Sequence, residues 1–181
     1  MKNYNKLSTK DIALLGILLA LHILLSSFYI PLFDNNRIMF SFFIKMVVGI
    51  IIRPKYAIGF GFIADIIGHI IHPLGPYFFG YTLTSICSCY IFSLCLYNKR
   101  ITYLNLIGSK LLVNVLCNVI MNSIWSYMLL SNGYIYYLIQ SLFKNVILFP
   151  LEVGLIILLF KLLLPMLKKY KIIEQNNITI I

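Results

Sequence analysis

Ionisable side chains interrupt the apolar segments of this chain, and three of them share one helical face. Asp65, His69 and His72 follow one another at spacings of four and three residues, which places them on the same side of a helix. Histidine and aspartate are metal ligands, so a metal site is one interpretation. A polar face that lines a ligand cavity is a second, and structural pairing of Asp65 with Lys45 or Lys144 is a third.

A second group of polar side chains lies in the last apolar segment, where Lys144 and Asn145 are adjacent and Glu152 follows. A charged amine at this depth is costly to bury alone and therefore needs a partner. Lys144 either forms a salt bridge with Asp65 or acts as an anion-binding group in a cavity open to the outside. The sequence leaves both interpretations open.

A polar stripe runs along the fifth apolar segment. Asn114, Asn118, Asn122 and Trp125 recur at spacings of four, four and three residues. Amide side chains of this kind can join neighbouring helices in a membrane. They can equally hydrogen-bond a heterocyclic ligand, with Trp125 stacking on its ring.

No catalytic motif accompanies these residues. The sequence contains no H-E-x-x-H, G-x-S-x-G or P-loop pattern, so it indicates neither a zinc hydrolase, a serine hydrolase nor an ATPase. We therefore expect a protein that is not an enzyme. If the protein is a transporter, a chain of this size without an ATPase motif would need an energy source outside itself.

The composition requires a lipid environment. Hydrophobic residues make up 61% of the 181 residues and charged residues 11%, against about 45–50% and about 25% in soluble domains. Lipid leaves only helices or a closed barrel as spanning structures, and the apolar runs here have helical length. The net charge of +10 does not indicate a nucleic-acid partner, because the basic residues lie at the ends of apolar runs, where they suit anionic lipid headgroups.

Breaks that contain proline, glycine, asparagine or basic residues divide a single membrane domain, residues 1–181, into six predicted transmembrane helices. Their expected ranges are about 11–30, 38–52, 56–71, 77–97, 104–130 and 136–167. Lysine and arginine gather at both chain ends and at the second and fourth breaks, whereas the other breaks carry only Arg37. Because such residues are enriched in cytoplasmic loops, we predict an all-α, six-helix bundle with both termini in the cytoplasm.

The first predicted helix carries small residues on one face, at Ala13, Gly16 and Ala20. Small residues at such spacings allow a second helix to approach closely within a membrane. This face is a candidate surface for a partner helix.

Several motifs occur in order along nearly the whole chain. They are Arg37-Ile38-Met39-Phe40, the Asp65-containing stretch 59–68, a P-x-G-x-Y-F-x-G-x-T-L pattern at 73–83, Asn122-Ser123-Ile124-Trp125, and Lys144-Asn145 followed by Pro150. Together they resemble the substrate-binding (S) component of energy-coupling factor (ECF) vitamin transporters, specifically the folate type. The pattern at 73–83 is the most specific of these motifs.

The resemblance implies a multi-pass S component of a prokaryotic plasma membrane that captures folate with high affinity at its outer side. It implies a membrane scaffold subunit and two cytoplasmic ATPases as partners, docking at Ala13, Gly16 and Ala20, and it implies no cofactor and no metal. The substrate-binding residues that it indicates are Arg37, Asp65, His72, Gly75, Tyr77, Phe78, Gly80, Thr82, Asn122, Trp125, Lys144 and Asn145.

Folate chemistry suits these residues. A carboxylate such as Asp65 can accept paired hydrogen bonds from the pterin edge, aromatic rings can stack on the pterin, and Arg37 or Lys144 can face the anionic glutamate tail. Two alternatives remain: an S component for thiamine, riboflavin or a nucleobase-like ligand, and an intramembrane metalloenzyme using Asp65, His69 and His72.

Overall fold

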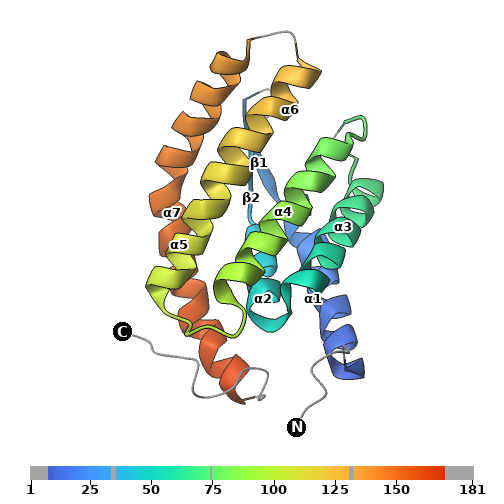
Figure 1. Ribbon diagram of the computed structural model, residues 1–181, viewed down its shortest axis with the longest axis vertical. Coiled ribbons are helices and arrows are strands. Elements are labelled where there is room, and N and C mark those ends of the chain that lie inside the picture. The colour runs from blue at the N-terminus through green and yellow to red at the C-terminus, as the bar shows by residue number, and fades with distance from the viewer. Residues whose placement is uncertain (1–7, 34–35, 74, 131–132, 170–181) are drawn as a thin grey trace.

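The computed structural model describes residues 8–33, 36–73, 75–130 and 133–169 of the chain. These residues form an elongated bundle of helices with one short antiparallel hairpin (Figure 1). Four helices of the described chain are long and apolar enough to cross a membrane, at Thr9–Ser27, Phe79–Leu96, Tyr103–Leu129 and Tyr134–Leu163. The prediction of a helical membrane protein is therefore confirmed.

The elements follow one another closely along the chain. In order they are α1 (Thr9–Ser27), β1 (Tyr29–Phe33), β2 (Asn36–Met39), α2 (Phe42–Ile51), α3 (Pro54–Ile71), α4 (Phe79–Leu96), α5 (Tyr103–Val113), the π-helix η1 (Asn114–Met121), α6 (Asn122–Leu129) and α7 (Tyr134–Lys169). Pro54 opens α3, where its missing N–H has no intrahelical partner to lose. The helix α7 continues through Pro150 and Pro165.

The hairpin corrects the expectation of a loop between the first two helices. Tyr29 pairs with Met39, Ile30 with Ile38 and Pro31 with Arg37 in antiparallel register, with an irregularity after Pro31. The prediction extended one helix to residue 30 and began the next at residue 38. Tyr29, Ile30 and Phe33 in β1 and Ile38 in β2 are aromatic or β-branched residues, which favour strands. The pairing also satisfies backbone groups that a membrane would leave without partners.

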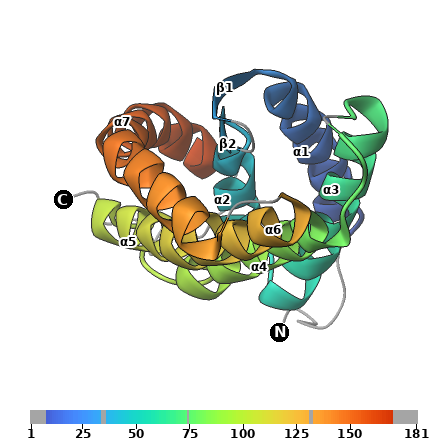
Figure 2. The ribbon, with the colours of Figure 1, turned by 90° about the horizontal axis from the view of Figure 1, so that it is seen from above.

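The short helix α2 lies at the centre of the bundle. Seven of its ten residues are buried, and the helices α1, α3 and α4 pack around it. By contrast α1 and α7 bury only 11% of their apolar windows, so their outer faces are suited to contact lipid. Figure 2 shows α2 and the hairpin between α1 and α3 on one side and α7 on the other.

The helix α4 makes two close contacts that fix its position. A Cβ added to Gly49 of α2 would lie 2.7 Å from Cβ of Phe92, and one added to Gly61 of α3 would lie 2.9 Å from Cα of Ile86. Glycine at both positions therefore allows the backbones of α2 and α3 to approach α4, as small residues do in membrane bundles.

The fifth apolar segment is one continuous run of helix with a π-helical middle. The π-helix η1 comprises eight residues between α5 and α6, and π-helical turns are rare and frequent at functional sites. Asn114 and Asn118 lie within η1, and Asn122 begins α6. The wider turn thus occurs where the predicted polar stripe begins.

Candidate ligand-binding site

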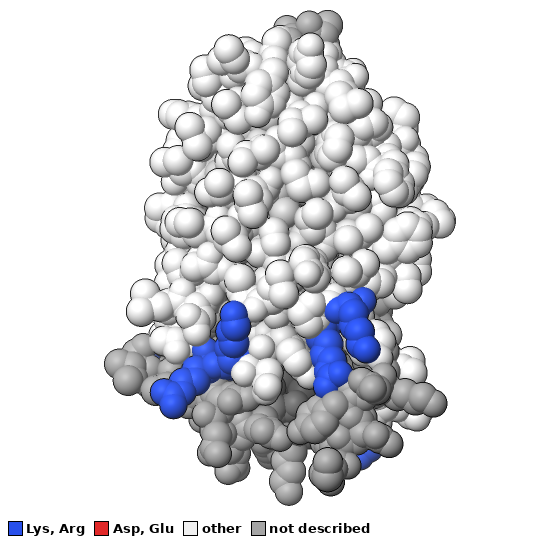
Figure 3. All heavy atoms as spheres, viewed as in Figure 1, with Lys and Arg blue, Asp and Glu red and all other residues white. Residues whose placement is uncertain are grey.

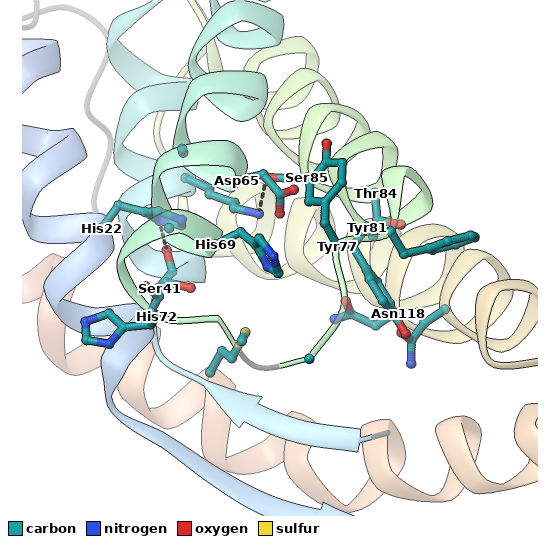
Figure 4. A pocket seen from close by; sticks show the side chains of 18 of the residues that line it. His22, Ser41, Asp65, His69, His72, Tyr77, Tyr81, Thr84, Ser85 and Asn118 are labelled. Carbon is teal, nitrogen blue, oxygen red and sulfur yellow. Dashed lines mark hydrogen bonds between the residues drawn. The ribbon is translucent and has the colours of Figure 1, made fainter. Parts of the chain in front are cut away.

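The bundle contains a cavity of about 510 Å³. It lies where α3 ends and α4 begins, and α1, β2, α2, α6, η1 and α7 complete its wall. Small-molecule pockets typically measure about 300–1,000 Å³, so this cavity suits a vitamin-sized ligand. Figure 4 shows several of its polar side chains directed into the same space.

Asp65 presents a carboxylate to this cavity and is held by a chain of hydrogen bonds. Thr82 Oγ1 donates to Asp65 Oδ2 at 2.7 Å. The Tyr77 hydroxyl lies 2.7 Å from Thr82 Oγ1 and donates to it, because the Thr82 proton is already engaged. Asp65 Oδ1 receives no hydrogen bond from the described residues, so it can accept donors from a ligand.

Histidines flank this carboxylate without joining it. The ring of His69 meets the Tyr77 ring edge-on, with centroids 5.2 Å apart. His72 follows the last residue of α3, and its ring points away from Asp65 in Figure 4. The described residues include no group of three or more His, Cys, Asp or Glu side chains that could hold a metal ion. The metal-site alternative at Asp65, His69 and His72 therefore has no geometric support.

An aromatic cluster forms the wall where α4 begins. Phe78 meets Tyr81 and Trp125 edge-on, each with a centroid separation of 5.7 Å. Trp125 Nε1 donates to Thr84 Oγ1 at 2.8 Å. A side chain at Gly80 would collide with the rings of Phe78 and Trp125, so this glycine is what lets the two rings pack over the helix.

Basic side chains occupy the deeper part of the cavity. Lys45 Nζ donates to Ser85 Oγ at 2.9 Å and to Ser88 Oγ at 3.3 Å. Lys144 of α7 also lines the wall. His22 Nδ1 donates to the backbone oxygen of Ser41 at 3.3 Å, and this bond ties α1 to the start of α2.

An ion pair between Lys110 and Glu152 lies deeper still. Lys110 Nζ is 3.0 Å from Glu152 Oε1 and 3.7 Å from the centroid of the Phe42 ring. Asn114 donates to Glu152 at 2.8 Å, and Asn118 donates to Asn114 at 2.8 Å. The predicted Asn stripe therefore begins in a helix-joining network, whereas Asn118 and Asn122 also line the cavity. No ion pair within 4.0 Å joins Asp65 to Lys45 or Lys144 among the described residues, and the hydrogen-bond donor to Asp65 is Thr82.

The structure brings seven of the twelve predicted site residues to the cavity surface: Asp65, His72, Gly75, Tyr77, Phe78, Asn122 and Lys144. Gly80, Thr82 and Trp125 lie behind that surface instead, where they support Phe78 and Asp65. Asn145 does not line this cavity either, and its amide donates to the backbone of Ser141 at 2.7 Å within α7. Arg37 lies in β2, and its side chain falls outside the described residues.

Other lining residues were not among the twelve predicted substrate-binding residues, although His69 and Asn118 belonged to polar helix faces that the sequence singled out. They include His22, Ser26, Met39, Ser41, Lys45, His69, Tyr81, Thr84, Ser85 and Asn118. His22, Lys45 and His69 carried a signal, since each is an ionisable residue inside an apolar run. Ser41, Thr84 and Ser85 carried none, because serine and threonine are common in membrane helices.

The comparison with protein families decides what kind of protein this is. Residues 10–168 match the family described as the substrate-specific component of ECF transporters. The chain belongs to this family. It is therefore a multi-pass protein of the plasma membrane, and its family role is in transport.

Individual members of the family are also similar to this chain. The folate transporter FolT of Leuconostoc mesenteroides is 27% identical over 158 residues, which cover 84% of this chain and 85% of that protein. The folate transporter FolT of Clostridium novyi is 30% identical over 116 residues, covering 64% and 67%. A crystal structure of FolT bound with folic acid has a TM-score of 0.74 and 31% identity, and covers 81% of this chain and 89% of that one.

Proposed function

We propose that this chain captures folate at the outer face of the membrane as the S component of an ECF importer. One observation carries the proposal: an anchored carboxylate, Asp65, faces a cavity of about 510 Å³ with one oxygen left to accept hydrogen bonds. The similarity to two folate transporters and to a folic-acid complex supports folate as the ligand.

The pterin end of folate suits the Asp65 side of the cavity. Its ring presents adjacent N–H donors on one edge, and a carboxylate can accept such donors in pairs with charge-assisted bonds. The ring is flat, and Tyr77 and Phe78 offer aromatic faces beside Asp65. Trp125 supports this wall from behind through its contact with Phe78.

The anionic tail of folate needs cationic partners. Lys45 and Lys144 both line the cavity, and Lys144 was the predicted partner together with Arg37. Opposite charges attract strongly where water is excluded. The cavity thus offers an acceptor for the heterocycle and amines for the carboxylates.

We further propose that six helical segments span the membrane with both termini in the cytoplasm. Supporting this, α1 begins and α7 ends at the same end of the bundle (Figure 1). On the face shown in Figure 3, the Lys and Arg side chains also gather near that end. Exposed residues in the breaks there are Lys55, Lys99 and Arg100, which suit the cytoplasmic side and its anionic lipids.

The chain would work with a membrane scaffold subunit and two cytoplasmic ATPases, which supply the energy. Ala13, Gly16 and Ala20 are all exposed on α1, and a Cβ at Gly16 would meet nothing within 4 Å. A scaffold helix could therefore pack closely against this face.

Uptake experiments test this function. The chain is co-expressed with ECF scaffold and ATPase subunits in cells that lack folate uptake, and accumulation of labelled folate is measured. We expect accumulation that disappears when the ATPases are inactivated by mutation. Uptake of thiamine or riboflavin in place of folate would agree with the family assignment but would show that folate is not the ligand.

A further inference from the structure

A second, smaller cavity lies on the inner side of the first. It measures about 140 Å³, and Met39, Ser41, Lys45, Asn118 and Lys144 line both cavities, so the two adjoin. Its remaining wall comes from the first residue of α2, from positions on α4 beyond Ser85, from α5 and from α7, and includes Phe92, Lys110, Asn145 and Glu152. It therefore lies deeper in the bundle than Asp65.

The charges around this inner cavity do not balance. Three lysines, Lys45, Lys110 and Lys144, face it with one carboxylate, Glu152. That carboxylate is already engaged, because Lys110 lies 3.0 Å from one oxygen and Asn114 donates to the other at 2.8 Å. With all four groups ionised, the wall carries an excess of two positive charges.

Lys45 shows the imbalance most clearly. Its hydrogen-bond acceptors are the neutral hydroxyls of Ser85 and Ser88. Neutral oxygens orient an ammonium group without cancelling its charge, and a charge inside a membrane protein is costly unless an opposite charge lies close to it. Asp65 lines the adjoining cavity but forms no ion pair with Lys45 within 4.0 Å. Glu152 also attracts Lys144 electrostatically, so this one carboxylate is shared between two amines.

We infer that the inner cavity is an anion site, held by Lys45 and Lys144 and distinct from the space around Asp65. Liquid water occupies about 30 Å³ per molecule, so a cavity of about 140 Å³ has room for a carboxylate or a halide with a few waters. It is smaller than the pockets of about 300–1,000 Å³ that typically hold drug-sized ligands. Asn118 adds an amide to the same wall.

The anion could have two sources with the same chemistry. One is a carboxylate on the tail of the ligand, which reaches the inner cavity through the shared wall; this source rests on the proposed function. The other is a free chloride ion, which would neutralise the lysines whether or not a vitamin is bound. Both sources require the same two amines.

The test compares the full-length purified chain with the variants Lys45→Gln and Lys144→Gln. Folate and pteroate, which lacks the glutamate, are titrated in chloride and in gluconate, and thermal unfolding is measured in both salts without a vitamin. Lys99→Gln, an exposed lysine, is the control for a simple change in net charge. Lys45→Arg keeps the charge and checks that the site tolerates substitution.

A ligand carboxylate in the site predicts that either glutamine variant weakens folate about ten- to hundredfold, since hydrogen bonds to charged groups contribute about 1.5–3 kcal/mol. Pteroate affinity would stay unchanged. A chloride ion in the site predicts instead that chloride raises the unfolding temperature of the wild type over gluconate, and that Lys45→Gln removes this difference.

The inference is overturned if both glutamine variants keep the wild-type preference for folate over pteroate and chloride has no effect beyond that of gluconate. The salt comparison needs no vitamin. If neither folate nor pteroate binds, the proposed function fails while the unfolding measurements still decide whether the anion site exists.

Discussion

At the scale of single residues, the most important side chains are three that are linked by hydrogen bonds, from Tyr77 to Thr82 and from Thr82 to Asp65. Each hydroxyl has one proton, so the direction of donation is fixed once Asp65 accepts from Thr82. The carboxylate is thereby oriented before a ligand arrives. A pre-oriented acceptor reduces the ordering cost of binding.

Replacing Asp65 by asparagine tests this acceptor directly. The amide side chain would keep an oxygen for Thr82 but lose the negative charge that strengthens bonds from a pterin edge. We expect folate affinity to fall about ten- to hundredfold, as loss of a charged hydrogen-bond partner typically costs about 1.5–3 kcal/mol. Titration calorimetry on the purified chain measures the change.

Asp11→Asn is the matched control, because the Asp11 carboxylate accepts a hydrogen bond from the backbone of Ser8 at the start of α1, at 2.9 Å. It should leave folate binding unaltered. Unchanged affinity in Asp65→Asn would remove Asp65 from ligand recognition.

Thr82 is predicted to act through Asp65 rather than on the ligand. Thr82→Val keeps the shape of the buried side chain and removes both the hydrogen bond to Asp65 and the one from Tyr77, each at 2.7 Å. We expect affinity to fall about fivefold, because Asp65 loses the bond that orients it and this costs about 1 kcal/mol of binding, and we expect Thr82→Ser to restore it. Equal losses in the serine and valine variants would instead indicate a packing defect.

At the scale of elements, the position of α4 decides where the site residues lie, since Thr82, Thr84 and Ser85 all belong to it. The two close contacts with α2 and α3 are made through glycines. The site therefore depends on packing at positions that never touch a ligand.

Gly61→Ala measures this dependence. The added methyl would lie 2.9 Å from Cα of Ile86, and overpacking of a well-packed interface costs about 1–3 kcal/mol. We expect a lower midpoint of thermal unfolding in detergent and weaker folate binding. Gly59→Ala on the same helix, with nothing within 4 Å, should change neither; an equal effect of both would show that α3 packs differently.

Much of the helical pattern could be predicted because apolar length and breaks determine it. Two elements could not be. The hairpin forms because Tyr29–Phe33 and Asn36–Met39 pair with each other, and apolar residues in a short segment do not reveal whether they pair as strands or continue a helix. The π-helix Asn114–Met121 depends on tertiary packing and has no periodicity of its own in the sequence.

Only part of the site could be predicted, because the sequence shows the type of a side chain but not how its helix packs. Asp65 and Lys144 could be found because they are ionisable groups within apolar segments, and Tyr77 because it belongs to the motif at 73–83. Ser41 and Ser85 could not, because only the packing of α2 and α4 turns them toward the cavity. Gly80 and Trp125 lie near the site but support it from behind, a distinction that spacing along one helix does not carry.

At the scale of the whole molecule, the buried α2 and the exposed α1 have separate roles. The cavity is built around α2 and α4, whereas Ala13, Gly16 and Ala20 face outward. Capture and docking should therefore be separable by mutation.

Gly16→Trp combined with Ala20→Trp tests that separation. The bulky rings would keep a scaffold helix at a distance, so we expect normal folate binding by the isolated chain and loss of co-purification with the ECF scaffold and of uptake. Leu21→Trp, exposed on α1 away from this stripe, serves as the control. If the double variant assembles normally with the scaffold, the docking surface is not the one formed by Ala13, Gly16 and Ala20.

The central claim is that this chain alone binds folate in the cavity beside Asp65. The most direct measurement is titration of folate into the purified, detergent-solubilised chain, followed by heat and by fluorescence of the single tryptophan, Trp125. We predict one site with a Kd on the order of nanomolar and quenching of Trp125, because Phe78 joins it to the cavity wall. If the folded protein gives no binding heat and no quenching of Trp125, folate is not its ligand.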